Sequence, residues 1–221
     1  MGEVRPRAMF PLQTVLFPGA PLPLRVFEPR YREMIMATMT EDRSFGVVLI
    51  RRGSEVGGGD ERHEVATLAD IEGLSQLESG QFAVLVRGTQ RLKIHRWLPD
   101  DPYPLAETEV LGEDLSGVDS SLLSTTLVAL RHARGLLSEL RDTPPLPGDL
   151  ALALDSPGGL IDAHWTLCDL APFDVFDRQR LLSEPTVHAR LILLQRLCNE
   201  LSNDVAELLA QGDGDLDIDE P

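Results

Sequence analysis

The sequence predicts an α+β fold in which a strand-rich first half is followed by a helical second half. The first half contains short apolar runs bounded by glycine or charged residues, such as 44–50 and 82–86, which are typical of buried strands. In the second half, apolar residues recur every three or four positions, which is typical of one face of a helix. The change between the two patterns falls near residues 112–117.

The strand-rich half is expected to form a domain over residues 1–115. Two further strands are expected at 65–71 and 92–97, beside the runs already named. A single helix is expected from Pro29 to Met39, because proline is favoured at the first helical position. Glu28 would then be the N-cap, with its carboxylate accepting a free backbone N–H.

The helical half is expected to form a bundle over residues 116–210. Helices are predicted at about 123–140, 160–170 and 174–182. The strongest pattern is the last helix, whose predicted buried face consists of Val187, Leu191, Leu194, Cys198, Leu201, Val205 and Leu208. Residues 211–221 are rich in acidic side chains and predict a disordered tail.

Composition excludes several classes of partner and location. The net charge is −16, and most of it falls after residue 112, so no basic surface is available for nucleic acid. No apolar run approaches the roughly 20 residues of a membrane helix. The N-terminus is polar, and two cysteines cannot form a secreted disulfide framework. We therefore expect a cytoplasmic protein without a membrane partner.

The sequence also argues against an enzyme. Lys93 is the only lysine, beside 19 arginines. A P-loop needs Gly-Lys followed by Ser or Thr, and Lys93 lies between Leu92 and Ile94. Lys93 also lies on the polar side of a predicted strand, where it is exposed to solvent. The lysine base of a Ser-Lys dyad needs a desolvated site that lowers its pKa. His164 and Cys168 have a spacing that could share a metal, but packing is the simpler interpretation, and no cofactor is expected.

Three segments near the N-terminus carry a resemblance to a known family. Met9–Leu12, Val15–Gly19 and Leu22–Tyr31 together resemble the opening signature of the Lon N-terminal domain, the substrate-binding domain at the head of Lon proteases. The resemblance extends over roughly residues 8–210, and weaker matches follow in the family's order at 65–71, 87–94, 177–182 and 190–191. Ala66 stands where the family pattern would place glycine.

The resemblance implies a PUA-like β-barrel N-terminal domain followed by a C-terminal helical bundle. It also implies a non-catalytic protein that captures unfolded or apolar polypeptide segments. We expect this chain to stand alone as an adaptor or holdase. The alternative is a regulatory subunit or partner of a separately encoded ATP-dependent AAA+ protease. RNA binding, which some PUA-like domains perform, is disfavoured by the charge.

Candidate binding residues lie in the first half. The apolar loop around Phe17 and Leu22 and the helix that carries Met34, Met36 and Met39 are predicted to contact polypeptide, because methionine suits adaptable binding surfaces. Simple packing of these methionines is the alternative. The residues that carry the resemblance most clearly are given a structural role: Arg25, Glu28, Pro29, Arg30 and Tyr31.

Overall fold

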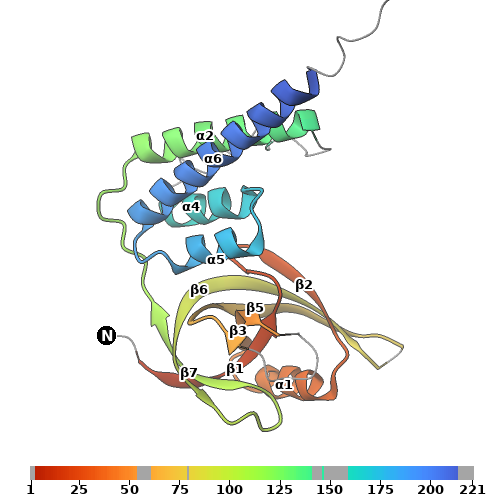
Figure 1. The fold of residues 1–221 in the computed structure, drawn as a ribbon. Helices are drawn as coiled ribbons and strands as arrows, with labels where there is room; N and C mark the ends of the chain where they lie inside the picture. The colour runs from red at the N-terminus through yellow and green to blue at the C-terminus, as the bar shows by residue number, and fades with distance from the viewer. Residues whose placement is uncertain (1–2, 54–60, 79, 141–145, 147–158, 214–221) are drawn as a thin grey trace, which may run out of the picture. The chain divides into compact units, whose positions relative to one another are not determined.

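The computed structural model describes residues 3–53, 61–78, 80–140, 146 and 159–213. Figure 1 shows the order of the elements along the chain. The strands are β1 (Arg5–Leu12), β2 (Pro21–Val26), β3 (Ser44–Arg52), β4 (Glu61–Arg62), β5 (Val65–Gln76), β6 (Phe82–Leu98) and β7 (Leu105–Leu111). The helices are α1 (Pro29–Met39), α2 (Ser120–Leu140), α4 (Gly159–Leu170), α5 (Val175–Ser183) and α6 (Val187–Asp213).

The chain divides into two compact units, and the first is discontinuous in sequence. Unit 1 comprises residues 1–112 with 174–183, and unit 2 comprises residues 113–173 with 184–221. The predicted boundary at residue 115 lies close to the division at residue 112. The prediction, however, placed α5 in the helical half, whereas the structure groups it with the strands of unit 1. Within unit 2, α6 ends at Asp213, so the predicted tail starts inside this helix. The rest of the tail, 214–221, lies outside the described residues.

The strands of unit 1 form a mixed sheet. Among the described residues the order is β1-β7-β6-β5-β3-β4, and β2 pairs with β6 beside this path. In addition, β1 pairs in parallel with β3, so the pairings of five strands close on themselves. Met9, Val48, Leu68, Leu92 and other apolar residues form a buried cluster among these strands. The PUA-like barrel is a more specific description and stays a prediction.

The longest strand, β6, corrects one expectation. The sequence predicted separate strands at 82–86 and 92–97, because Gly88 appeared to end the first of them. The structure instead has one continuous strand, which pairs with β2, β5 and β7. A Cβ atom at Gly88 would collide with the backbone carbonyl of Phe17. Gly88 is therefore needed for a close crossing of two backbones, not for a turn.

The two-residue strand β4 was missed, and so were the longer strands β1, β2 and β7, which prolines or charged residues obscure. Prolines at 6 and 11 interrupt the pattern of β1, and prolines at 21 and 23 interrupt that of β2. In β7, Leu105–Leu111, glutamates alternate with small or branched residues. Proline is compatible with a strand wherever its missing N–H is not needed for a ladder hydrogen bond.

Helix α5 is attached to the sheet by side chains that bond to backbone carbonyls. Arg91 on β6 is 2% exposed, and its Nη1 donates to the carbonyl of Leu182 at 3.1 Å. In the other direction, Gln179 Nε2 donates to the carbonyl of Val65 on β5 at 3.1 Å. The guanidinium of Arg178 lies 4.6 Å from the ring centroid of Phe17. These contacts explain why a helix so distant in sequence belongs to unit 1.

In unit 2, α2 and α6 run along each other, with α4 beside them (Figure 1). The predicted apolar faces are buried over most of their length, including Leu130 and Leu194, which are both 0% exposed. The predictions were wrong at the ends of these faces, because Leu208 is 57% exposed and Leu140 is 41% exposed. The term helical bundle goes beyond these contacts and stays a prediction.

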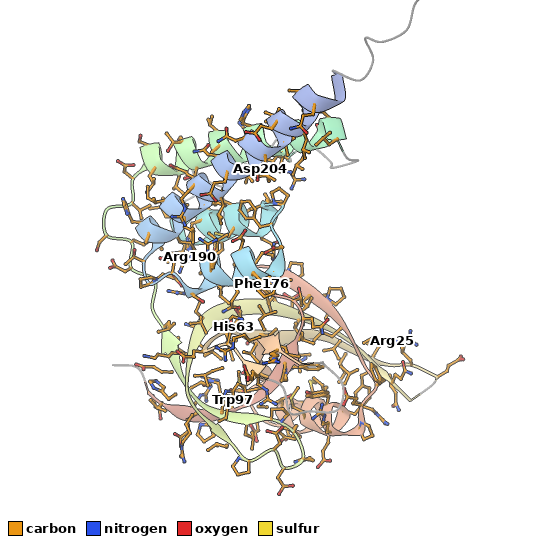
Figure 2. All side chains as sticks on the ribbon, viewed as in Figure 1. Arg25, His63, Trp97, Phe176, Arg190 and Asp204 are labelled. Carbon is orange, nitrogen blue, oxygen red and sulfur yellow. The ribbon has the colours of Figure 1, made fainter. Side chains whose placement is uncertain are left out.

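A buried polar cluster lies inside unit 2 around Arg190, whose position is labelled in Figure 2. The side chain of Arg190 is 0% exposed, and its Nη1 lies 3.0 Å from the Glu113 carboxylate and 3.0 Å from His164 Nε2. Its guanidinium also stacks over the Trp165 ring at 4.0 Å. His164 therefore has a structural partner inside unit 2. This agrees with the interpretation of His164 as a packing residue and not as a metal ligand.

Replacing Leu194 by alanine should lower the free energy of unfolding by about 2–5 kcal/mol, because it leaves a cavity at a fully buried site. Leu208→Ala is the matched control on the same helix, and its exposed site should change stability by less than about 0.5 kcal/mol. Urea melts of both variants measure the difference. Equal effects would show that α6 does not bury the face described above.

Replacing Arg91 by methionine should weaken the attachment of α5 to β6. The substitution keeps an apolar stem but leaves the carbonyl of Leu182 without this donor, which costs about 1–3 kcal/mol at a buried site. Hydrogen exchange followed by mass spectrometry should show faster exchange of the α5 amides, with α6 unchanged. Arg96→Met, on the exposed side of the same strand, is the control and should leave α5 unchanged. Unaltered α5 exchange in Arg91→Met would contradict the attachment described.

Candidate functional site

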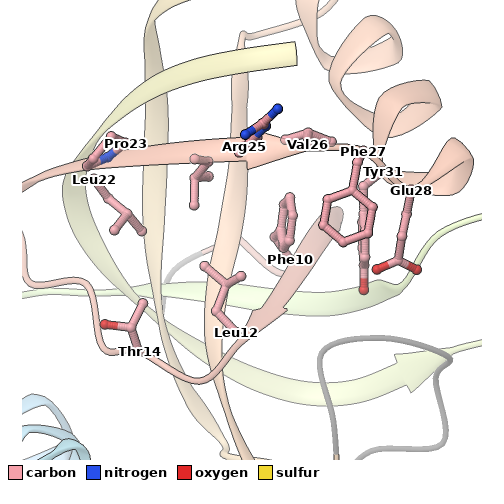
Figure 3. A pocket seen from close by; sticks show the side chains of 11 residues that line it. Phe10, Leu12, Thr14, Leu22, Pro23, Arg25, Val26, Phe27, Glu28 and Tyr31 are labelled. Carbon is pink, nitrogen blue, oxygen red and sulfur yellow. The ribbon is translucent and has the colours of Figure 1, made fainter. Parts of the chain in front are cut away.

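An open cavity of about 260 Å³ lies in unit 1 beside β2 (Figure 3). Its walls come from β1, β2, the start of α1 and the segments that join them. The lining residues are Phe10, Leu12, Thr14, Leu22, Pro23, Leu24, Arg25, Val26, Phe27, Glu28 and Tyr31. Most of these side chains are apolar, and the lining includes Arg25 and Glu28 as its charged residues.

The alternation of β2 places its apolar side chains on the cavity side. Along this strand Leu22 and Leu24 are half-buried and Val26 is buried, whereas Pro21, Pro23 and Arg25 are exposed. Successive side chains of a strand point to opposite faces, so one face of β2 is apolar. The strand is held in register by β6, where Leu24 pairs with Val84.

Stacked aromatic rings form one wall. The rings of Phe10 and Tyr31 lie 4.2 Å apart at an angle of 11°, and Phe45 packs against Phe10 at 6.0 Å. The guanidinium of Arg30 lies 4.5 Å from the Tyr31 ring centroid. Tyr31 is therefore packed against both a ring and a cation, which fixes the wall before any ligand arrives.

The end of the cavity near α1 has one exposed aromatic side chain and one carboxylate. Phe27 is 54% exposed, although it is large and apolar. Figure 3 shows it beside Glu28 and Tyr31. The predicted capping role of the Glu28 side chain is wrong: Glu28 occupies the N-cap position, but its carboxylate makes no capping hydrogen bond. Instead, Arg30 Nε donates a hydrogen bond to the Glu28 carboxylate, at 3.1 Å from Oε2.

The predicted binding residues are dispersed in the structure. Leu22 lines the cavity, but it lies in β2 and not in a loop. Phe17 and Met34 are 0% exposed, so neither is available to a partner in this conformation. Met39 is half-buried and Met36 is 52% exposed, and neither is among the residues that line the cavity. The two faces of α1 thus separate Met34 from Met36, as their spacing predicts.

The residues given a structural role prove closer to the site than the methionines. Arg25, Glu28 and Tyr31 line the cavity, Pro29 is the first residue of α1, and Arg30 holds Glu28 and Tyr31. Sequence reasoning missed seven lining residues: Phe10, Leu12, Thr14, Pro23, Leu24, Val26 and Phe27. The alternation of apolar residues at 22, 24 and 26 was the available signal for part of this set.

A second, polar cavity of about 220 Å³ lies in unit 1 between β1 and the end of α1. Burial opposes ionisation of Asp42, but hydrogen bonds from Ser44 and the charge of Arg5 outweigh it and keep the pKa of Asp42 below its usual value. Arg5 Nη2 lies 2.9 Å from the Asp42 carboxylate. Burial lowers the pKa of Arg7, whose Nη1 is 3.7 Å from the same carboxylate. These groups compensate one another and resemble a surface ion-pair network.

The described residues bring together few groups suited to catalysis. No cluster of three or more His, Cys, Asp or Glu side chains in them could hold a metal ion. Burial raises the pKa of Cys198 to about 12, so this thiol is not a nucleophile at neutral pH. Lys93 is exposed on β6, as expected from its place in the strand.

None of the helices in the described ranges has the length and hydropathy required to span a bilayer.

Comparison with known proteins agrees with the resemblance seen in the N-terminal segments. Residues 7–200 match the family model described as the ATP-dependent protease La (LON) substrate-binding domain. The chain is 31% identical over 203 residues to Lon protease 2 of Herpetosiphon aurantiacus, covering 88% of this chain and 23% of that protein. It is 27% identical over 188 residues to the Lon protease of Anaeromyxobacter dehalogenans, covering 84% and 22%. The chain therefore spans less than a quarter of the length of these relatives.

Two solved structures share the fold. A Lon N-terminal domain protein from Xanthomonas campestris aligns with a TM-score of 0.61 and 26% identity, covering 86% of this chain and 96% of that one. The N-terminal domain of a Lon protease from the Mycobacterium avium complex aligns with a TM-score of 0.58 and 17% identity, covering 90% and 99%. The sequence and structural matches agree, and the chain belongs to the Lon substrate-binding domain family.

Proposed function

We propose that the protein binds apolar segments of unfolded polypeptides without catalysis, as a cytoplasmic adaptor or holdase, and that the cavity beside β2 receives them. The observation that supports this proposal most strongly is Phe27. It exposes 54% of its surface at the edge of an apolar cavity. A concave site lined mostly by apolar side chains is typical of a binding site, and Phe27 adds exposed apolar surface at its edge.

The size and rigidity of the cavity suit one apolar side chain of a client. A cavity of roughly 150 Å³ is enough to bind benzene, and this one measures about 260 Å³. The stacked pair Phe10–Tyr31 forms a packed apolar wall of the cavity. Because a disordered client loses conformational entropy when it binds, we expect about micromolar affinity or weaker.

A handover role is the alternative. The relatives matched over this domain are Lon proteases, so captured segments could be passed to a separately encoded ATP-dependent protease. The two roles differ in an assay that measures degradation of a labelled unfolded client by a purified AAA+ protease. An adaptor accelerates the degradation, whereas a holdase slows it.

Replacing Phe27 by serine should weaken client binding by roughly three- to tenfold, because part of the roughly 1.5–3 kcal/mol from burying a phenylalanine is lost. Fluorescence anisotropy with a labelled, permanently unfolded polypeptide measures the affinity. Phe27 is more than half exposed, so the variant should keep its melting temperature.

Met36→Ser is the matched control, since Met36 is equally exposed at 52% but lies outside the cavity lining. A loss of affinity in Met36→Ser with none in Phe27→Ser would move the binding site to the methionine face of α1. No binding by the unaltered protein would refute the proposed function itself.

A further inference from the structure

The backbone of β2 that borders the cavity offers hydrogen-bond acceptors and almost no donors. Gly88 N–H donates to the carbonyl of Ala20 at 3.0 Å, which fixes the alternation of the β2–β6 ladder. In an antiparallel pair, every second residue directs its backbone groups at the partner strand. These residues are Leu22, Leu24 and Val26, so the backbone groups of Pro21, Pro23 and Arg25 point away from β6.

Prolines occupy two of the three outward positions. Pro21 and Pro23 have no N–H, so the free edge of β2 carries three carbonyls and a single N–H, that of Arg25. A client strand needs alternating donors and acceptors to extend a sheet. The edge therefore disfavours strand addition, and it is complementary to a partner that brings donors.

Glu28 adds a further acceptor at the α1 end of the same cavity. Its Oε2 receives Arg30 Nε at 3.1 Å, while the structure gives Oε1 no hydrogen-bond donor among the described residues. Figure 3 shows this carboxylate directed to the same side as the Phe27 ring, whereas the Arg25 side chain points to the opposite side of β2. The Arg25 guanidinium bonds to Gln81 at 2.7 Å.

We propose that the cavity selects polypeptide segments in which a large apolar side chain has lysine or arginine neighbours, and that Glu28 and the outward carbonyls of β2 receive their cationic groups. This selectivity rests on the proposed function and names its client class. Lysine and arginine carry only donors, which matches an edge rich in acceptors.

The test uses three short synthetic peptides with one central phenylalanine, flanked by lysine, serine or glutamate. The peptides are otherwise identical, carry a fluorescent label and have blocked termini. The lysine peptide should bind the full chain about two- to fivefold more tightly than the serine peptide, as expected for exposed ion pairs, and the glutamate peptide should bind most weakly. At high salt the three affinities should converge, because exposed charges are screened.

Two variants assign the effect to this site. Glu28→Gln keeps the size of the side chain and should remove most of the difference in affinity between the lysine and serine peptides. Glu33→Gln is the control, since Glu33 is an exposed glutamate of the same helix that does not line the cavity. It should retain the lysine preference.

The outcomes distinguish failure of the lysine selectivity from failure of polypeptide binding itself. Equal affinities for all three peptides, or a lysine preference that survives Glu28→Gln, would overturn the selectivity and leave polypeptide binding intact. Absence of binding by any of the peptides and by a long unfolded polypeptide would overturn the proposed function as well. A lysine preference lost only in Glu28→Gln supports the proposal.

Discussion

The organisation of unit 1 depends on the buried guanidinium of Arg91. A charge taken out of water is stable only when polar partners surround it, and Arg91 obtains part of this set from the carbonyls of Leu182 and Gly112. These bonds tie α5 to β6. Helix α5 in turn places Arg178 over the ring of Phe17, whose carbonyl passes close to Gly88. The segment that leads into β2, and hence one wall of the cavity, is positioned by these contacts.

Local sequence patterns predicted much of the fold, since they report local geometry. The bounds of α1 follow from Pro29 and the apolar positions behind it, and α6 follows from its apolar repeat. The assignment of α5 to the sheet could not be predicted in this way. It depends on hydrogen bonds between residues far apart in the sequence, such as Gln179 and Val65, which leave no periodic signal.

The candidate site was only partly predictable for a similar reason. Leu22 lines the cavity, whereas the predicted contact residue Phe17 is fully buried, and its ring packs against Arg178 from the distant α5. The methionines of α1 were proposed as binding residues because of their residue type alone. The cavity is instead lined by alternate apolar residues of β2 and by Phe10 on β1. Glu28 illustrates the limit of capping rules, since a nearby arginine competes for the same carboxylate.

Photo-crosslinking tests the central claim, that apolar polypeptide segments enter the cavity beside β2, most directly. A photo-reactive phenylalanine analogue is introduced at position 27 and, in a second protein, at position 128. Val128 is also exposed, at 64%, but it lies on α2 in unit 2. The account predicts that an unfolded client crosslinks efficiently at position 27 and weakly at position 128. Equal crosslinking at both positions, or crosslinking at 128 alone, would contradict it.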